Sequence, residues 1–273
     1  MARVMSLSVV TWNINSVRLR IGLVTKLLEH WQPDVLCLQE TKCPQGQFPS
    51  GPIRALGYEH IAEFGQKGYH GVAIVAKQPF LAQSTKPFCG KDDCRHISVT
   101  VAAKKKPVTI HNLYVPAGGD EPDPAINEKF AHKLQFIEEL DEWFGNDCVP
   151  DGHEAIVVGD LNIAPLEHDV WSHKDLLKVV SHTPVETQGL LRIQKTGGWV
   201  DLMRQHVPPE QKLYTWWSYR ARDWELSNRG RRLDHIWSTP GLAPKCKDIE
   251  VLKAARGWEQ PSDHVPVIAR FAL

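Results

Sequence analysis

The feature that most constrains the fold of this chain is a repeated pattern in which a short apolar run ends in a few polar residues. Continuous apolar runs of about four to eight residues are typical of strands buried on both faces of a sheet. Runs of this kind, each ending in Asn, Asp, Glu or Tyr, occupy residues 7–15 (LSVVTWNIN), 33–42 (PDVLCLQETK), 107–116 (PVTIHNLYVP) and 154–162 (EAIVVGDLN). Because α/β folds commonly build their sites at strand ends, we expect these polar side chains to belong to a site.

The rest of the sequence predicts helices and further strands. Residues 16–31 carry Leu, Val and Ile at helical spacing, with Ser16 as the expected N-cap, and residues 124–144 are amphipathic. An exposed turn is expected at Lys104–Lys106, short helices and loops over 165–212, and strands at 70–77, 96–103, 232–238 and 264–271. No linker divides the chain, so the pattern predicts one α/β domain over residues 1–273 with a short lead at 1–6. It leaves parallel or mixed strand pairing open.

Composition narrows the possible functions. The 273 residues include 32 basic and 32 acidic side chains, so the formal net charge is zero and binding to nucleic acid would require a local basic face. The chain contains no apolar run near the ~20 residues that span a bilayer and no signal-peptide pattern, so we expect a cytoplasmic protein without a membrane partner. The six cysteines form no C-x-x-C pair, which favours reduced structural thiols over a zinc site.

Four carboxylates lie beside the predicted strands: Glu40, Asp160, Asp234 and Asp263. A hard divalent cation such as Mg²⁺ takes oxygen ligands and keeps several waters, so one or two carboxylates suffice to hold it. Any one of the four could instead be a cap or turn residue. The segment GDLNIAP is more specific, because Asp160 and Asn162 stand two apart on an expected extended segment and would point the same way. Together they could orient a water and an oxyanion.

A histidine and a tyrosine add to this set. His264 lies in the segment PSDHVPV, and Asp234 is a candidate carboxylate to orient its ring. A histidine held by an aspartate is the usual arrangement for an oriented acid–base group or a charge-stabilising imidazolium. Tyr114 ends the run at 107–116 and is suited either to packing with a bonded hydroxyl or to polarising a phosphate.

Residues 214–234 (YTWWSYRARDWELSNRGRRLD) combine five arginines with aromatic side chains. Arginine binds phosphate bidentately, and aromatic planes stack on bases, so this segment predicts a nucleic-acid-binding face. The alternative is an ordinary loop whose tryptophans belong to the core. The glycine-rich segment GQKGYHG at 65–71 adds Lys67 and Tyr69 as weaker candidates.

These motifs occur in an order that resembles the exodeoxyribonuclease III family of abasic-site endonucleases, within the endonuclease/exonuclease/phosphatase superfamily. The resemblance runs from about residue 9 to residue 270 and rests on WNINSVR, LQETK, GQKGYHGVAI, NLYVPAG, GDLNIAP, YTWWSYR, NRGRRLDHIW and PSDHVPV. It implies a DNase I-like four-layer α/β sandwich, with two mixed β-sheets face to face and helices outside. It also implies a phosphodiesterase, dependent on Mg²⁺ or Mn²⁺, that acts on double-stranded DNA damaged at abasic sites or 3′ ends. The sequence leaves the oligomeric state open, and a monomer is the default expectation.

The resemblance assigns roles to matching positions. Three residues would hold the metal: Glu40 as the principal ligand, with Asn13 and Asp263 nearby. Five would act on the phosphate: Asp160 orienting or deprotonating the attacking water, Asn162 and Tyr114 contacting the phosphate, and His264, supported by Asp234, stabilising charge on a non-bridging oxygen. Because these roles differ, Asp263 and His264 need not touch each other, and His264 is expected to bond to Asp234. Five more would contact DNA: Trp216 and Leu233 in a small apolar pocket for the abasic sugar, Arg231 at its wall, and Tyr69 and Lys67 on a loop that presses on a groove.

Three departures from the family pattern bear on these assignments. Asn15 stands where some relatives carry Asp, Arg231 where some carry an aromatic residue, and the acidic loop PAGGDEPD offers no arginine to grip DNA. Two other readings remain open. One is another phosphoesterase of the superfamily, either a DNase I-like nuclease or an inositol or lipid phosphatase. The other is a non-catalytic DNA-binding protein. The sequence does not rank abasic-site cleavage, 3′→5′ exonuclease and 3′-phosphatase activities.

Overall fold

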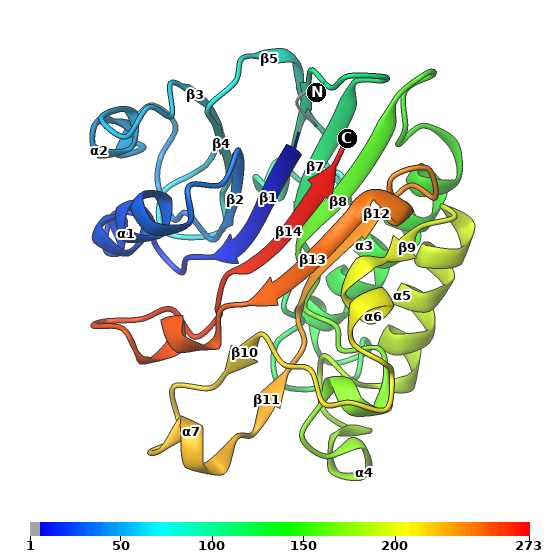
Figure 1. The fold of residues 1–273 in the computed structure, drawn as a ribbon. Helices are drawn as coiled ribbons and strands as arrows, with labels where there is room; N and C mark the ends of the chain where they lie inside the picture. The colour runs from blue at the N-terminus through cyan, green and yellow to red at the C-terminus, as the bar shows by residue number, and fades with distance from the viewer. Residues whose placement is uncertain (1–5) are drawn as a thin grey trace.

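The apolar runs form the central strands of two six-stranded β-sheets in this computed structural model, which describes residues 6–273 (Figure 1). The first sheet has the order β13-β14-β1-β2-β4-β3, with β1 at Ser6–Asn13, β2 at Val35–Gln39, β3 at His60–Phe64, β4 at Val72–Ala76, β13 at Cys246–Val251 and β14 at Val267–Ala272. The second has the order β5-β6-β7-β8-β12-β9, with β5 at Phe80–Thr85, β6 at His96–Val101, β7 at Val108–Tyr114, β8 at Glu154–Asp160, β9 at Val200–Asp201 and β12 at Asp234–Ser238.

Both sheets are mixed. The pairs β1–β2 and β7–β8 are parallel, and the remaining neighbours within each sheet run antiparallel. The parallel strands are fully buried along most of their length, which is why their sequences are continuously apolar rather than alternating. The prediction of two mixed sheets in an α/β fold is confirmed.

Helices α1 (Ile21–Trp31) and α2 (Ser50–Arg54) cover the outer face of the first sheet, and α3 (Glu128–Asn146) and α5 (Pro184–Thr196) cover that of the second (Figure 1). Of the shorter helices, α6 (Leu202–His206) packs into the core between the sheets, and α4 (His173–Leu176) and α7 (Trp224–Ser227) lie at one end of the sandwich. One core cluster lies between the sheets, a second joins α1 to the first sheet, and a third joins α3 and α5 to the second. The result is four layers around three apolar interfaces. No helix within residues 6–273 is both long and apolar enough to cross a membrane.

Two predicted helix starts are wrong. Ser16 does not cap a helix: it has a φ of 84°, and α1 begins only at Ile21. The reason is that the backbone beyond β1 continues to pair with the segment after β2, with Ser16 N donating to Glu40 O at 2.7 Å. The helix expected from residue 124 begins at Glu128, where the Asn127 side chain accepts a hydrogen bond from Lys129 N.

Two further local expectations are confirmed. Lys104, Lys105 and Lys106 form an exposed turn between β6 and β7, and residues 165–212 contain short helices and loops, of which α5 is the longest. Of the short lead expected at residues 1–6, residues 1–5 lie outside the described part of the chain, and Ser6 already begins β1.

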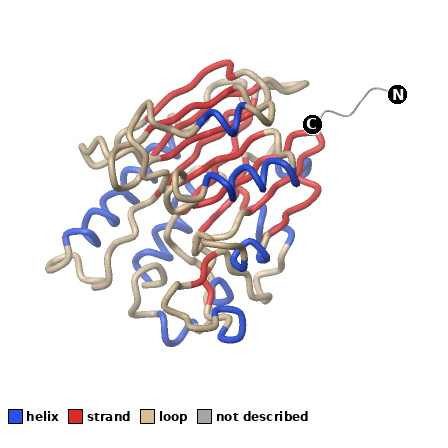
Figure 2. Tube along the Cα trace, turned by 90° about the vertical axis from the view of Figure 1, so that its left-hand side faces the viewer, coloured by secondary structure: helices blue, strands red, loops and turns tan. Residues whose placement is uncertain are grey.

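One end of the sandwich carries most of the irregular structure. A two-stranded ribbon of β10 (Trp216–Trp217) and β11 (Gly230–Arg231), together with α4 and α7, extends from this end (Figure 1). Figure 2 shows the long strands away from these loops, with only short strand segments among them. Because β1, β2, β7 and β8 all end at this side while β12 begins there, their polar terminal residues meet at one edge.

Candidate active site

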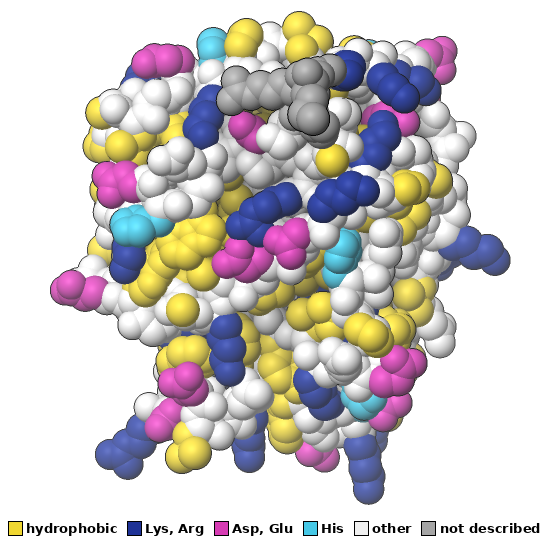
Figure 3. Space-filling view, in the orientation of Figure 1, with side chains coloured by type: hydrophobic (Ala, Val, Ile, Leu, Met, Phe, Trp, Pro, Cys, Tyr) yellow, Lys and Arg dark blue, Asp and Glu magenta, His cyan; other side chains and the backbone are white. Residues whose placement is uncertain are grey.

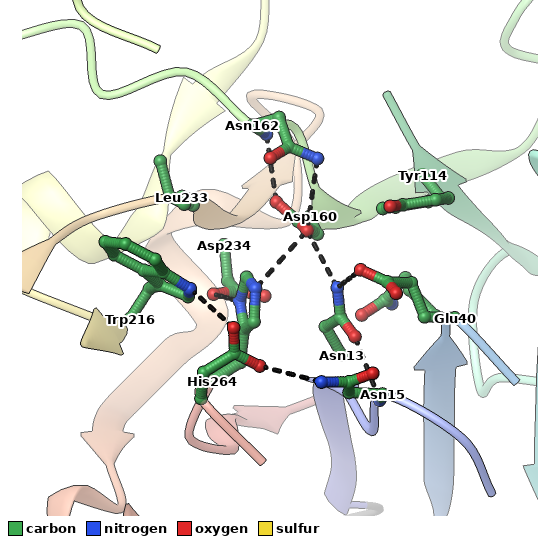
Figure 4. A network of polar contacts seen from close by, with 12 residues as sticks. Asn13, Asn15, Glu40, Tyr114, Asp160, Asn162, Trp216, Leu233, Asp234 and His264 are labelled. Carbon is green, nitrogen blue, oxygen red and sulfur yellow. Dashed lines mark hydrogen bonds and ion pairs between the residues drawn. The ribbon is translucent and has the colours of Figure 1, made fainter. Parts of the chain in front are cut away.

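Strand register brings the predicted site residues together. Asn13 pairs with Gln39 at the end of β1 and β2, so Glu40 follows beside Asn13. In the second sheet Asp160 is opposite both Tyr114 and Asp234. The segment before β14 brings His264 to the same edge, where its backbone forms an isolated antiparallel β-bridge with Trp216. Figure 4 shows these side chains pointing toward one another from both sheets.

Asp160 and Asn162 form a tight turn after β8. The buried Asp160 accepts a hydrogen bond from Asn162 N at 2.9 Å and from Asn162 Nδ2 at 3.2 Å. Asn162 has a φ of 54° and lies beyond the strand, so the expectation of an extended segment is wrong. The two side chains nevertheless meet, because Asn tolerates the left-handed conformation that turns it back. The second amide hydrogen of Asn162 is donated to Val115 O at 2.9 Å.

His264 is held from one side by Asp234. Its Nδ1 donates to Asp234 Oδ2 at 2.8 Å, and its Nε2 stands 3.6 Å from Asp160 Oδ2. Asp263 turns elsewhere and accepts hydrogen bonds from Trp216 Nε1 at 2.9 Å and from Asn15 Nδ2 at 3.2 Å. The predicted bond between His264 and Asp234 is confirmed, and the adjacent Asp263 and His264 serve different partners.

Burial and charge act in opposite directions on this histidine. Burial alone lowers the pKa of His264, but the carboxylates of Asp234 and Asp160 outweigh it and raise the pKa to about 10. Burial raises the pKa of Asp160 to about 7, although the neighbouring His264 opposes that shift. The imidazole is therefore held protonated between two buried carboxyl groups.

Glu40 and Asn13 form the other half of the site. Asn13 Nδ2 donates to Glu40 Oε1 and to Asp160 Oδ2, both at 2.9 Å, and so links the two sheets. Lys42 Nζ lies 2.8 Å from Glu40 Oε2. Burial alone would raise the pKa of Glu40, but Lys42 and the bond from Asn13 lower it overall, which keeps the carboxylate charged. Glu40 has a φ of 48°, an uncommon conformation that turns it into the cleft.

Two groups of residues could supply ligands to a metal ion. Among the described residues, one group of three offers acidic or imidazole ligand atoms within 4.8 Å of one another, namely Asp160, Asp234 and His264. The hydrogen bond and the ion pair that link them account for this proximity. The predicted ligands Glu40 and Asn13 are bonded to each other, and Asn15 connects them to Asp263 by bonding to both Asn13 and Asp263. This second set is rich in oxygen donors, with a charged carboxylate, and its chemistry fits a hard divalent cation.

Tyr114 lies under an arginine that sequence reasoning did not single out. The Arg95 guanidinium is centred 5.0 Å from the Tyr114 ring, and Arg95 Nη1 donates to Tyr114 O at 3.2 Å. Arg95 Nη2 also lies 2.9 Å from His70 Nε2. Burial, followed by the charges of Glu40 and Asp160, raises the pKa of Tyr114 well above its usual value. The hydroxyl therefore stays protonated and remains a hydrogen-bond donor.

The site opens into a cleft of about 760 Å³ between the sandwich edge and the β10–β11 ribbon. Trp216 and Leu233 line it, with the Arg231 guanidinium 5.4 Å above the Trp216 ring. Arg231 is fixed there because its Nη1 donates to Ser181 Oγ at 2.8 Å and to Val180 O at 3.0 Å. Figure 3 shows Lys and Arg side chains projecting around this end of the molecule.

The arginine–tryptophan segment divides between cleft and core. Arg220, Arg229 and Arg231 line the cleft, as predicted for a nucleic-acid face. Arg232 does not: it is fully buried and pairs with Asp169 at 2.7 Å and Asp201 at 2.7 Å. The prediction that Arg232 belongs to a binding face is therefore wrong. Tertiary contacts point Arg231 toward the cleft and Arg232 into the core.

Trp217 also belongs to the core rather than to the cleft. Lys67 and Tyr69 lie on an exposed loop between β3 and β4, where Tyr69 is 71% exposed, and neither lines the cleft. The motif LQETK contains Lys42, to which the sequence assigns no role, and no motif includes Arg95 or Trp171. Arg95 stands immediately before β6, which begins at His96, and nothing in its local sequence marks it. Trp171, which stacks 4.6 Å below the Arg229 guanidinium, carries no local signal.

Comparison with known proteins gives a consistent result. Residues 10–264 match the family model described as Endonuclease/Exonuclease/phosphatase family. The chain is 31% identical to exodeoxyribonuclease III of Haemophilus influenzae, over 96% of this chain and 98% of that protein. Among solved structures, an AP endonuclease from Archaeoglobus fulgidus superposes with a TM-score of 0.88 at 32% identity, covering 98% and 100% of the two chains. A 3′ phosphatase from Neisseria, bound to a product DNA hairpin, superposes with a TM-score of 0.88 at 31% identity and the same coverage.

Proposed function

Because the chain belongs to the endonuclease/exonuclease/phosphatase family, we propose that it is a metal-dependent DNA repair nuclease that hydrolyses phosphodiester bonds in duplex DNA. Its expected reactions are cleavage 5′ to an abasic site, 3′→5′ degradation and removal of 3′-blocking groups. The names of the relatives support this range, since they include an exodeoxyribonuclease, an AP endonuclease and a 3′ phosphatase.

The observation that carries the proposal is the continuous polar chain across the cleft. Asp234 holds His264, the far nitrogen of His264 faces Asp160, and Asp160 is bonded by both Asn162 and Asn13. Hydrolysis of a phosphodiester needs a positioned water, neutralisation of the charge on the pentacoordinate phosphorus, and help for the departing oxygen. The connected side chains from Asp234 to Asn13 offer both a position for the water and neutralisation of the phosphorus charge.

Each residue then receives a role. Asp160 orients and deprotonates the attacking water, and its raised pKa makes it a stronger base than an exposed aspartate. Protonated His264, kept in orientation by Asp234, stabilises charge on a non-bridging oxygen. Asn162 and the hydroxyl of Tyr114 donate to the phosphate, and Asn162 must exchange one of its present bonds to do so.

We assign the metal to the oxygen-rich side of the cleft. Glu40 is the principal ligand, with Asn13 and Asp263 nearby, and Mg²⁺ or Mn²⁺ suits these hard donors. When bound, such an ion supplies Lewis-acid stabilisation of the phosphate and its leaving oxygen. Lys42 pairs with Oε2 of Glu40, the oxygen that Asn13 does not bond, and this pairing keeps the carboxylate ionised.

The walls of the cleft suit double-stranded DNA. Exposed Arg229 and the partly buried Arg231 each stack on a tryptophan and remain close enough to the cleft to meet phosphates. Trp216 and Leu233 offer an apolar surface to a flipped abasic sugar, where a normal nucleotide would fit poorly. We assign Tyr69 and Lys67, on their exposed loop, to contact with the DNA groove. A single domain acting as a cytoplasmic monomer remains the prediction from sequence.

The test is incubation of the purified chain with a duplex that contains one abasic analogue. In the presence of Mg²⁺ the abasic strand should be nicked, and EDTA should stop the reaction. Parallel rates on abasic, 3′-phosphate and recessed-end duplexes rank the three activities. Binding of the duplex without cleavage in any of the three would overturn the proposal and favour a non-catalytic DNA-binding protein. Hydrolysis of inositol phosphates in place of DNA would favour the phosphatase branch of the superfamily.

A further inference from the structure

A lysine with no contact to solvent lies directly behind the cleft. Lys133, in the second turn of α3, is 0% exposed, and its ammonium group points toward the loops at the site rather than outward. Lys133 Nζ donates to Asn162 O at 2.8 Å and to Ala117 O at 3.2 Å. Its aliphatic stem packs so closely on Gly118 that a Cβ there would lie 2.9 Å from Lys133 Cδ. Two loops at the cleft therefore meet on one side chain.

The counter-ion of Lys133 fixes a third loop. Glu186, in the first turn of α5, is also 0% exposed, and its Oε1 lies 2.5 Å from Lys133 Nζ. The same carboxylate accepts hydrogen bonds from Ser181 N at 2.9 Å and from Thr183 N at 3.1 Å. Ser181 is the residue whose hydroxyl anchors Arg231 over Trp216. The buried pair thus reaches the apolar wall of the cleft as well as the turn after Asp160.

Stability is a poor explanation for this arrangement. A buried ion pair loses so much hydration that an apolar pair of similar volume is often as stable or more stable. The position of the pair offers a better explanation. Asn162 is in the left-handed conformation, which is strained unless its surroundings hold it. Its carbonyl is bonded to Lys133, and its side chain is bonded to the carboxylate of Asp160.

We propose that the buried Lys133–Glu186 pair is a positioning device that sets the Asn162 turn, and through it Asp160, against the reacting phosphate. The ammonium ion fixes the carbonyl of Asn162 from behind, while Glu186 fixes the loop that carries Ser181. Neither residue touches the substrate, so both act through the groups they hold. This role rests on the proposed nuclease function, because it concerns the same Asp160 and Asn162.

The experiment compares the wild-type chain with the double variant Lys133→Met/Glu186→Gln on the abasic duplex with Mg²⁺. The double variant leaves no unpaired buried charge, and the glutamine can still accept from Ser181 N. We expect a folded protein whose kcat is about a hundredfold lower while KM for DNA is unchanged, as follows when a remote change misplaces a reacting group. Leu140→Ala, a buried apolar change on the same helix, is the matched control and should lower Tm without lowering kcat.

A double-mutant cycle with Asn162→Ala separates positioning from general loosening of the fold. If Lys133 acts through Asn162, its replacement should cost little further kcat once Asn162 has been truncated. Full additivity of the two effects, or a wild-type kcat in the folded double variant, would overturn the proposal.

Lys133→Arg keeps the charge and the donors to both carbonyls, and it tests the same idea if the methionine variant does not fold. Its kcat should stay close to that of the wild type, and a kcat as low as that of Asn162→Ala would reject the role. A wild-type chain that cuts none of the three duplexes would instead remove the nuclease function itself and the positioning role with it.

Discussion

The protein buries two clusters of charge close to each other, and they are built in opposite ways. The site cluster consists of Asp160, Asp234 and His264, and the arginine cluster consists of Asp169, Asp201, Arg204 and Arg232. In the arginine cluster two carboxylates face two guanidinium groups, and Asp169 alone is bonded by both arginines. In the site cluster two carboxylates share one imidazole, and Asp234 Oδ1 has no hydrogen-bond partner among residues 6–273.

The pKa values follow this difference. Burial alone would raise the pKa of Asp169, but Arg232 and then Arg204 lower it overall. Burial raises the pKa of Asp160, and the single imidazole does not reverse the shift. A balanced cluster stabilises one structure, whereas an unbalanced one keeps a basic group available for chemistry. In this molecule the ratio of cations to carboxylates therefore separates site from scaffold, although Asp160 and Asp234 are as buried as Asp169 and Arg232.

The largest expected effect tests the site cluster. Asp160→Asn removes the proposed base without changing the shape of the side chain, so kcat on the abasic duplex should fall about a thousandfold. The Kd for the duplex should stay near that of the wild type, because the lost interaction acts mainly in the transition state. Steady-state rates and a binding titration measure the two quantities. An equal loss of binding and rate would place Asp160 with the structural cluster instead.

The arginine cluster should respond in stability rather than in rate. Asp169→Asn leaves two buried guanidinium groups short of a counter-ion, so the free energy of unfolding should fall by about 3–5 kcal/mol. Urea unfolding measures this change, and kcat corrected for the folded fraction should match that of the wild type. If the corrected kcat fell as far as in Asp160→Asn, the division between the two clusters would be wrong.

Neighbouring arginines offer a smaller and more specific test. Arg229→Gln removes a cation that lines the cleft, so it should weaken DNA binding and lower the salt slope of the binding constant by about 1. Arg192→Gln removes a cation from the outer face of α5, where it pairs with Glu138, and serves as the matched control. The salt slope for Arg192→Gln should equal that of the wild type. Equal slopes for both variants and the wild type would show that DNA does not contact Arg229.

The smallest expected effect concerns pH. The pKa of Asp169 is lower in the folded chain than in the unfolded chain, so its contribution to stability is present above the unfolded pKa of about 3.9. That contribution is lost as the pH falls through the folded pKa. The difference in unfolding free energy between the wild type and Asp169→Asn should therefore shrink on acidification below about pH 4. Urea titrations at several acidic pH values measure it, and a constant difference would mean that Asp169 keeps its proton affinity on folding.

Much of the site could be predicted because its signals are local. LQETK and GDLN each place a chemically distinctive residue at the end of an apolar run, and SDH places one just before such a run. The structure brings Glu40, Asp160 and His264 to one cleft. The bond from His264 to Asp234 was also predicted, since a histidine in a site requires an orienting carboxylate. The roles of these residues remain predictions that the variants above address.

Other features could not be predicted because long-range contacts decide them. Arg231 and Arg232 are adjacent, and the local sequence does not distinguish them. Hydrogen bonds to Val180 and Ser181 hold Arg231 at the cleft. A hydrogen bond to the buried Asp169 holds Arg232 in the interior. Lys133 appears in the sequence as one more charged position on an amphipathic helix, and its burial depends on Glu186, far along the chain.

The sequence alone specifies the buried strands and the polar residues at their ends. This follows from the hydrophobic effect, which acts on each apolar run wherever it lies and leaves polar side chains at the boundaries. Which of these polar groups meet depends on the tertiary structure alone. The bond from Asn13 to Asp160 spans 147 residues, and that from Trp12 to His264 spans 252. Contacts at such separations depend on how the two sheets pack and on their register, which no short stretch of sequence encodes.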